Sequence, residues 1–259
     1  MNFQRILTLA TNVFAETIRD RVLYLIGLYA IALLAGAQML PQLAAGTGDK
    51  ILLDFGLNIM SFLGLIITIF VGTNLINKEV DKKTMLVLIS KPIARWELIV
   101  GKHWGLSFVL AILVFAMTII YLLVLWLKQV PFELGSLLLA SLFLFLQLAL
   151  ITAVAIFFGV FTSSLLATLL TFAIYLMGHF TRDLLEFGEI SESPGLQNLA
   201  QGLYLILPDL ARLDLKNQAV YGIEALPQAS TLATNVAYGI VYVILLLAIA
   251  SWIFARREF

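Results

Sequence analysis

Residues 103–127 read HWGLSFVLAILVFAMTIIYLLVLWL, a run without a single Asp, Glu, Lys or Arg. A helix of about 20 residues crosses the roughly 30 Å hydrocarbon core of a bilayer, so this run is long enough for one crossing. Further charge-free runs cover residues 22–48, 55–77, 134–181 and 225–255. These runs indicate that the chain folds in a membrane.

The composition supports the same conclusion. Apolar residues make up 61% of the 259 positions and charged residues only 12%, and the mean hydropathy is +1.01. Soluble domains carry about 25% charged residues, so a soluble enzyme is excluded. The formal net charge is zero, without the broad basic surface that a nucleic-acid partner requires. The chain has no cysteine, which excludes disulfides and thiolate metal sites. The sequence therefore predicts an all-α membrane protein that binds no nucleic acid.

The number of crossings follows from the lengths of the runs. Residues 134–181 are too many for one crossing, and we expect two helices separated at Phe161-Thr162-Ser163-Ser164, where small and hydroxylated side chains permit a turn. We predict six transmembrane helices in one domain that covers residues 1–259. Their expected ranges are 22–40, 56–76, 104–127, 137–160, 164–181 and 236–254. An even number of crossings leaves both termini on the same side.

The basic residues and the tryptophans indicate the orientation. With the N-terminus in the cytoplasm, the inner segments hold eleven of the sixteen Lys and Arg residues, as the positive-inside rule expects. The tryptophans fall near expected interfaces, as an aromatic belt requires: Trp96, Trp104 and Trp252 at the inner side and Trp126 at the outer side. We therefore predict a protein of the plasma (inner) membrane with cytoplasmic N- and C-termini.

Two segments outside the crossings also have helical periodicity. Residues 3–18 place apolar side chains on one face, which predicts that the segment 1–21 forms an amphipathic helix in the inner interface. The segment 182–235 is acidic, and it contains a leucine-rich stripe that ends at Pro208. It predicts an outer helical cap that rests on the outer leaflet, and we interpret its acidity as that of an ordinary outer loop.

Several kinds of chemistry have no residues to support them. The expected crossings contain no Asp, Glu, Lys or Arg, which proton- or ion-coupled carriers and pumps normally need inside the bilayer. Gly101-Lys102 is followed by His103 rather than Ser or Thr, so the chain lacks a phosphate-binding loop. It also lacks a Gly-x-Ser-x-Gly elbow and a His-Glu-x-x-His helix. We therefore expect a chain without enzymatic activity, a cofactor or a metal of its own.

A few polar residues do lie inside the expected crossings. Such side chains either line a pathway or form hydrogen bonds between helices, and the sequence leaves both interpretations open. They include Asn58, Thr68, Asn74, Gln147, Thr152, Thr168 and Thr171.

Residues 77–102, NKEVDKKTMLVLISKPIARWELIVGK, concentrate charge between two apolar runs. Six basic residues lie here together with acidic ones. Glu79 and Asp81 suit the start of a short helix, and Pro92 suits the first turn of a second one. Binding of lipid headgroups explains the lysines, but anionic lipids would repel the acidic side chains. This inner loop is therefore expected to bind headgroups, to dock a cytoplasmic partner, or to do both.

The order of motifs in this loop resembles that of a known family, the membrane subunits of type-two ABC exporters. The resemblance rests on Glu79, Thr84, the apolar stretch Met85 to Ile89, Lys91-Pro92-Ile93, Arg95 and Gly101-Lys102. This chain has Lys83 where members more often carry Gly. The amphipathic N-terminal segment, the long segment before the last crossing and Leu207-Pro208-Asp209-Leu210 also resemble the family, so the likeness covers nearly the whole chain.

The resemblance implies a permease that works with a separate ATPase subunit, which would bind ATP and Mg²⁺. Residues 77–102 would form the coupling helix, with Glu79 as the central contact to the ATPase and the surrounding contacts from Lys78, Lys82, Lys83, Thr84 and Arg95. Two copies of the permease, usually as a homodimer, would enclose the cargo pathway near the second and fifth crossings. Asn58, Thr68 and Thr171 are the candidate pathway residues. The cargo stays undetermined.

Two other functions are considered. The chain could be a membrane scaffold or assembly factor whose loop recruits a cytoplasmic protein without transport. It could also be an intramembrane enzyme acting on lipid, although convergent acid, base or metal-binding groups are missing from the sequence.

Overall fold

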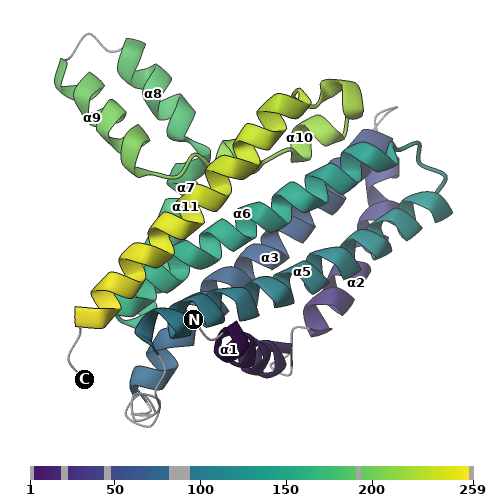
Figure 1. Cartoon of the computed structure of the whole chain (residues 1–259). Helices are drawn as coiled ribbons and strands as arrows, with labels where there is room; N and C mark the ends of the chain where they lie inside the picture. Colours follow the sequence, from purple (N-terminus) through teal and green to yellow (C-terminus); the bar gives the residue numbers. More distant parts are fainter. Residues whose placement is uncertain (1–2, 19–22, 44–47, 82–93, 191–193, 257–259) are drawn as a thin grey trace.

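The computed structural model describes residues 3–18, 23–43, 48–81, 94–190 and 194–256 (Figure 1). These residues form helices joined by turns, with no strand among them. In chain order the elements are α1 (Phe3–Thr17), α2 (Leu23–Leu43), α3 (Gly48–Asp81), α5 (Arg95–Leu127), α6 (Leu134–Phe161), α7 (Ser164–His179), α8 (Thr181–Ile190), α9 (Pro194–Ile206), η2 (Leu210–Leu213), α10 (Lys216–Ala219), η3 (Ile223–Ala225) and α11 (Ala229–Arg256).

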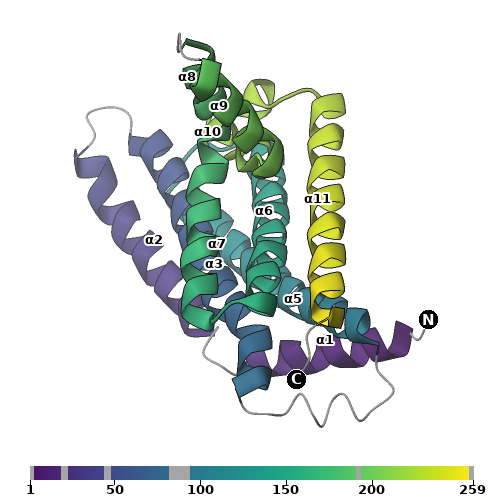
Figure 2. The ribbon, with the colours of Figure 1, turned by 90° about the vertical axis from the view of Figure 1, so that its left-hand side faces the viewer.

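Helix α6 lies at the centre of the bundle and packs against α3, α5, α7 and α11 (Figure 2). Within the described residues, four helices are long and apolar enough to cross a membrane: Gly48–Asn77, Arg95–Leu127, Leu134–Phe161 and Ala229–Arg256. Two shorter apolar helices, Tyr24–Leu40 and Ser164–His179, accompany them. The chain is thus an all-helical integral membrane protein, as its composition predicts.

The interior of the bundle is closely packed, and its exterior is also apolar. Tyr121 is fully buried, and its hydroxyl donates a 2.7 Å hydrogen bond to the Leu53 carbonyl of α3. Large side chains such as Phe115 and Leu165 are largely exposed instead. An exposed apolar surface of this kind is expected where lipid replaces water around the helices.

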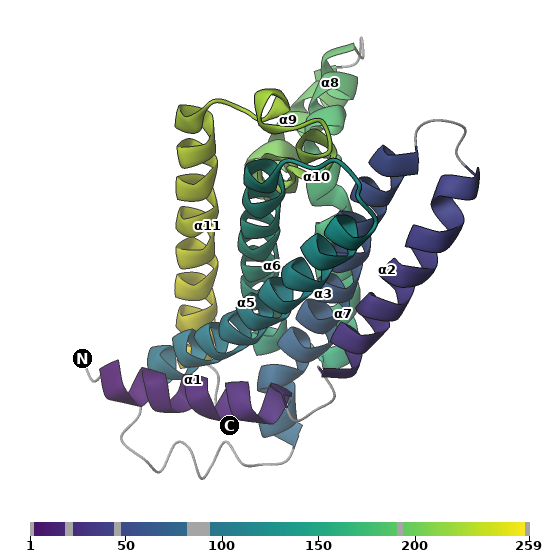
Figure 3. The same ribbon diagram turned by 90° about the vertical axis from the view of Figure 1, so that its right-hand side faces the viewer.

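Helix α1 lies across one end of the bundle, where the N- and C-terminal ends of the traced chain also lie (Figures 2 and 3). We call this the α1 end and the opposite end the α10 end. The predicted helix over 3–18 is present, and it buries Ile6, Ala10 and Val13. It approaches α5 closely at Gly105, where an added Cβ would lie 2.6 Å from Cβ of Val13. Glycine therefore permits α1 and α5 to pack with their backbones in contact.

The helices extend beyond the charge-free runs that predicted them. Helix α3 spans 34 residues, and α5 begins at Arg95, so the second helix expected near Pro92 and the crossing predicted at 104–127 form one continuous helix. The first turns of α5 therefore contain Glu97 and Lys102, which are 5% and 3% exposed. Lys102 donates a hydrogen bond from Nζ to the Leu75 carbonyl of α3. Hydropathy marks the part of a helix suited to lipid, but backbone hydrogen bonding decides where the helix ends. The predicted break after Phe161 is confirmed.

The segment between α7 and α11 divides into two parts with different environments. Helices α8 and α9 pack against each other and project from the bundle (Figure 1). The chain then returns, and the leucines at 210, 213 and 215 are buried in the same apolar core as α3, α5 and α6. The outer helical cap predicted for 182–235 therefore describes only part of the segment, because it also contributes buried side chains to the bundle: Leu207, Leu210, Leu213, Leu215 and Ala219. The segment was interpreted from its overall acidic composition, so the short apolar stretch within it was not recognised as part of the core.

Candidate functional site

Most of the predicted ATPase contacts fall outside the described side chains. Lys78 and Glu79 belong to the last turn of α3, whose backbone alone is described there. Lys82, Lys83 and Thr84 lie outside the described residues.

Arg95 is the one predicted ATPase contact with a described side chain, and it bonds within the chain. Its Nη1 donates hydrogen bonds of 2.9 Å to the Phe254 carbonyl and 3.0 Å to the Ala255 carbonyl. These carbonyls belong to the last turn of α11, where intrahelical partners are missing and a cation is favoured. Arg95 therefore joins the start of α5 to the end of α11, a contact that sequence reasoning missed.

The three predicted pathway residues do not form a shared site. Asn58 is exposed, and its Nδ2 donates to the Asp54 side chain at 2.9 Å. Thr68 and Thr171 are fully buried, and each hydroxyl donates to the carbonyl four residues earlier on its own helix. The printed bonds of all three lie within their own helices, so these side chains do not form the hydrogen bonds between helices that the sequence left open.

A polar contact between α3 and α7 does occur, one or two turns away from Thr68. Oγ1 of Thr73 and Oγ1 of Thr168 lie 3.1 Å apart, and the Ser164 hydroxyl donates to Oδ1 of Asn74. We call Thr73, Asn74, Ser164 and Thr168 the α3–α7 seam. Asn74, Ser164 and Thr168 are only partly buried, so this seam meets the surface of the bundle. The sequence does carry a signal for this seam, because the polar residues Ser164 and Thr168 are four positions apart and therefore lie on one helical face.

A second polar cluster lies at the α10 end. Lys216 Nζ lies 3.3 Å from Oδ2 of Asp214 and donates a 3.1 Å hydrogen bond to the Ser61 hydroxyl of α3. Nε2 of His179 lies 3.6 Å from the same carboxylate oxygen and 2.9 Å from Nε2 of Gln147. We call these five residues the Asp214 network. They come from α3, α6, α7 and the segment before α11, so sequence spacing gave no sign of their meeting.

The Asp214 network is electrostatically balanced. Burial by itself raises the pKa of Asp214, but the interaction with His179 and the charge of Lys216 outweigh it, so the net pKa lies below its ordinary value. The carboxylate is therefore held in its charged form. The segment before α11 is held against α3 by the Lys216–Ser61 hydrogen bond and against α7 by the contact of Asp214 with His179.

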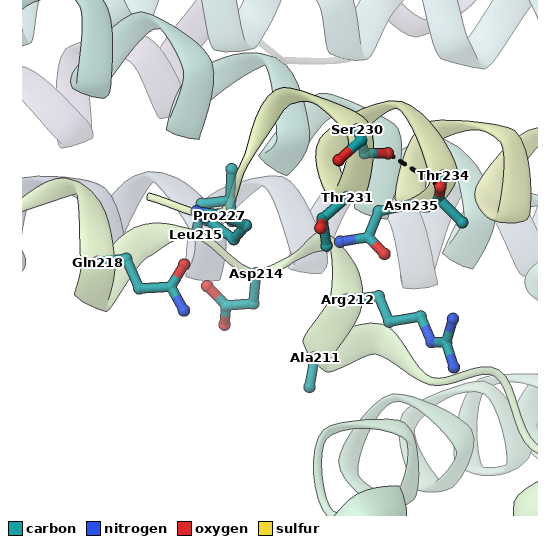
Figure 4. A pocket seen from close by; sticks show the side chains of 10 residues that line it. All are labelled: Ala211, Arg212, Asp214, Leu215, Gln218, Pro227, Ser230, Thr231, Thr234 and Asn235. Carbon is teal, nitrogen blue, oxygen red and sulfur yellow. Dashed lines mark hydrogen bonds between the residues drawn. The ribbon is translucent and has the colours of Figure 1, made fainter. Parts of the chain in front are cut away.

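A polar pocket of about 420 Å³ borders this network (Figure 4). Arg212 and Asp214 line it from one side, and Thr231 and Asn235 of α11 line it from the other. Arg212 itself is paired with Asp209, its Nε lying 3.0 Å from Oδ2. The described residues contain no group of three or more His, Asp or Glu side chains that could hold a metal ion. The arrangement thus offers polar contacts and fixed charges rather than a catalytic constellation.

A family model described as "ABC-2 family transporter protein" matches residues 7–259. No curated protein matches the chain. The family match covers all the long apolar helices, α1 from residue 7 onward, and the whole segment that carries the Asp214 network.

Proposed function

Because this chain belongs to the ABC-2 family of transporter proteins, we propose that it is a permease subunit that exports its cargo with ATP hydrolysed by a separate subunit. The observation that carries the proposal is the match over residues 7–259, together with four long apolar helices. Direction and the ATPase partner come from the resemblance of residues 77–102 to exporters.

We propose that α2 and α7 complete a set of six crossings, although both are shorter than the other four. The α1 end would face the cytoplasm, with both termini there, in a plasma (inner) membrane. The basic residues of residues 77–102 support this orientation by the positive-inside rule. Helix α7 has 16 residues, and α2 has 21 residues with an apolar part at Tyr24–Leu40. Apolar stretches this short reach across a bilayer only where it is thin or where flanking polar residues extend to the interface.

Coupling would occur at the α1 end. Helix α3 reaches Asp81 and α5 begins at Arg95, so both helices lead directly to the charged loop that we propose docks on the ATPase. Glu79 would be the central contact, supported by Lys78, Lys82, Lys83, Thr84 and Arg95. Because Arg95 is bonded to the last turn of α11, movement of the loop would be transmitted to α5 and α11 together.

The pathway would lie between two copies of this chain, next to α3 and α7. The partly buried polar groups of the α3–α7 seam support this location better than the buried Thr68 and Thr171 do. Asn58 stays a candidate because it is exposed on α3. A second copy is part of the proposal, and the membrane lipids would surround the remaining apolar face.

The decisive experiment replaces Glu79 with Arg in the chain co-expressed with its ATPase. We expect the variant to insert normally but to lose permease-dependent ATP hydrolysis, because a reversed charge in a docking groove is repelled. The matched control is Glu224→Arg, an exposed acidic position at the α10 end, which should leave hydrolysis unchanged. Full coupling in the Glu79 variant would contradict the proposal.

The scaffold alternative is not favoured by the family match. It makes a different prediction, which the same preparations test. A scaffold would co-purify with a cytoplasmic protein that has no nucleotide-binding site, whereas a permease subunit should retain an ATPase.

A further inference from the structure

An apolar groove of about 760 Å³ runs between α5 and α11 with α6 at its base. It lies apart from the α3–α7 seam, and its volume is within the range of ligand pockets. Trp96, Trp104 and Phe108 line it from α5, and Val243 and Leu247 line it from α11. Apolar lining of this kind accommodates a hydrocarbon chain.

Two polar atoms in this groove lack a hydrogen-bond partner. Nδ1 of His103 and Oγ of Ser107 are both buried and unpartnered, and both residues line the groove. His103 is 5% exposed. The two residues are four positions apart on α5, so they lie on the same face one turn from each other. Burying such atoms without partners is costly, which points to a ligand that supplies them.

The chemistry of His103 restricts that ligand. Its Nε2 lies 3.0 Å from the Ala149 carbonyl, which can only accept, so Nε2 carries the hydrogen. In the neutral imidazole Nδ1 is then a bare acceptor that requires a donor. The Ser107 hydroxyl can donate as well as accept. An alcohol meets both requirements, because its O–H donates to Nδ1 and its oxygen accepts from Ser107. A choline headgroup or an ester carbonyl has no hydrogen to donate.

The position of the two atoms also fits a lipid alcohol. Helix α1 crosses α5 at Gly101 and Gly105, on either side of His103. If α1 lies in the membrane interface, His103 is at the depth where acyl chains meet headgroups. The apolar part of the groove continues along α5 to Ala111, away from α1.

We propose that this groove binds a membrane lipid that carries a free hydroxyl group, of the diacylglycerol class. One acyl chain lies between α5 and α11, and the hydroxyl bonds to His103 and Ser107. Arg95 joins the same two helices at the α1 end, and the helices separate away from that end (Figure 3), so the lipid braces α5 against α11 where they begin to diverge.

Trp96 and Trp104 allow a direct test, because they line the groove and bromine quenches tryptophan fluorescence on contact. The full chain carrying Trp126→Phe and Trp252→Phe is reconstituted in phosphatidylcholine vesicles. One vesicle series contains a dibrominated diacylglycerol, and the other contains its methyl ether, which has the same chains but no hydroxyl. We expect half-maximal quenching at a five- to tenfold lower mole fraction of the alcohol, a ratio typical of one or two net hydrogen bonds.

Substitutions distinguish the contribution of the two hydrogen bonds to lipid binding from that of the apolar groove. His103→Leu and Ser107→Ala should lose the preference for the alcohol. Ala111→Phe fills the groove, leaves the polar atoms in place and should reduce quenching by either lipid. The control is Ile112→Phe. Ile112 is 48% exposed and lies beside the groove, so this variant should bind both lipids as the parent does. Equal quenching by the alcohol and the ether, or strong quenching in the Ala111→Phe variant, would overturn the proposal.

Discussion

Lys216 donates a 3.1 Å hydrogen bond to the hydroxyl of Ser61, 155 positions earlier in the chain. The contact is buried, and it fastens the segment before α11 to the middle of α3. The charge of Lys216 is neutralised by Asp214, which also faces His179 on α7. Through Ser61 and Asp214, Lys216 therefore connects the segment before α11 to both α3 and α7.

Replacing Lys216 with Met should destabilise the protein strongly. The methionine fills the space but leaves the partly buried Asp214 carboxylate without its cation. Breaking a fully buried pair costs about 3–5 kcal/mol, and the partial exposure of Asp214 makes about 3 kcal/mol the upper end here. The measurement is the thermal unfolding midpoint in detergent. Lys128→Met, in the exposed turn between α5 and α6, is the control and should change the midpoint little. A similar midpoint for the two variants would show that the Lys216 pair does not stabilise the fold.

Acid should weaken the same network. Because the folded-state pKa of Asp214 lies below its ordinary value of 3.8, its contribution is complete above that value. The contribution is lost as the pH falls below 3.8 and through the folded-state pKa. Unfolding midpoints of the parent and of Asp214→Asn, measured from neutral pH downward, should therefore converge in acid. A constant difference between them at all pH values would contradict the assignment.

Arg95→Lys should loosen the end of α11 while keeping the charge. Lysine lacks the planar fork of arginine and would not hold the carbonyls of Phe254 and Ala255 in the same geometry. We expect amide hydrogen exchange in the last turn of α11 to accelerate about tenfold, equivalent to one lost charged hydrogen bond. Arg256→Lys, whose parent side chain stacks on Trp252, is the control. Unchanged exchange together with weaker ATPase binding would assign Arg95 to the ATPase contact alone.

Gly105→Ala should displace α1 from α5. The new Cβ would lie 2.6 Å from Cβ of Val13 and 2.7 Å from the Ala10 carbonyl, and overpacking of this kind costs about 1–3 kcal/mol. Since the chain has no cysteine, Ala10→Cys provides a single thiol that should react faster in the Gly105 variant. Gly27→Ala has open space around its Cβ, and it should leave labelling unchanged and stabilise the helix by about 0.5–1 kcal/mol.

Cysteines at Thr73 and Thr168 should join α3 to α7 by a disulfide. The hydroxyl oxygens are 3.1 Å apart in the parent, so the two side chains point toward each other across the α3–α7 contact. If the cargo passes along the α3–α7 seam, oxidation should stop permease-dependent ATP hydrolysis and a reductant should restore it. The two single-cysteine variants control for the substitutions. Hydrolysis that continues in the oxidised double variant would place the pathway elsewhere.

The membrane class and most helices could be predicted from the sequence because hydropathy is a local property. In lipid each helix satisfies its own backbone, so a charge-free run of sufficient length is almost enough to define it. The break between α6 and α7 was predicted for the same reason, from Phe161 to Ser164. The crossings predicted at 56–76 and 104–127 are shorter than α3 and α5, because helices continue into charged residues wherever their side chains find partners, as Lys102 does.

The candidate site was less accessible to sequence reasoning. Thr68 and Thr171 were chosen for their polarity, but a threonine in a helix can satisfy its hydroxyl on its own backbone, and both do. The contacts of Glu79, Lys78, Lys82, Lys83 and Thr84 with an ATPase stay predictions. Thr73 and Thr168 are paired in the structure, although 95 positions separate them.

The sequence by itself determined that this chain is an integral membrane protein made of apolar helices. The motifs of residues 77–102 also indicated the transporter family. Only the tertiary structure decided that Lys216 meets Ser61, that Arg95 meets Phe254, and that His103 faces a groove with one nitrogen unsatisfied. The physical reason is range: hydropathy and helix formation depend on neighbours in the chain, whereas these contacts depend on how distant helices pack.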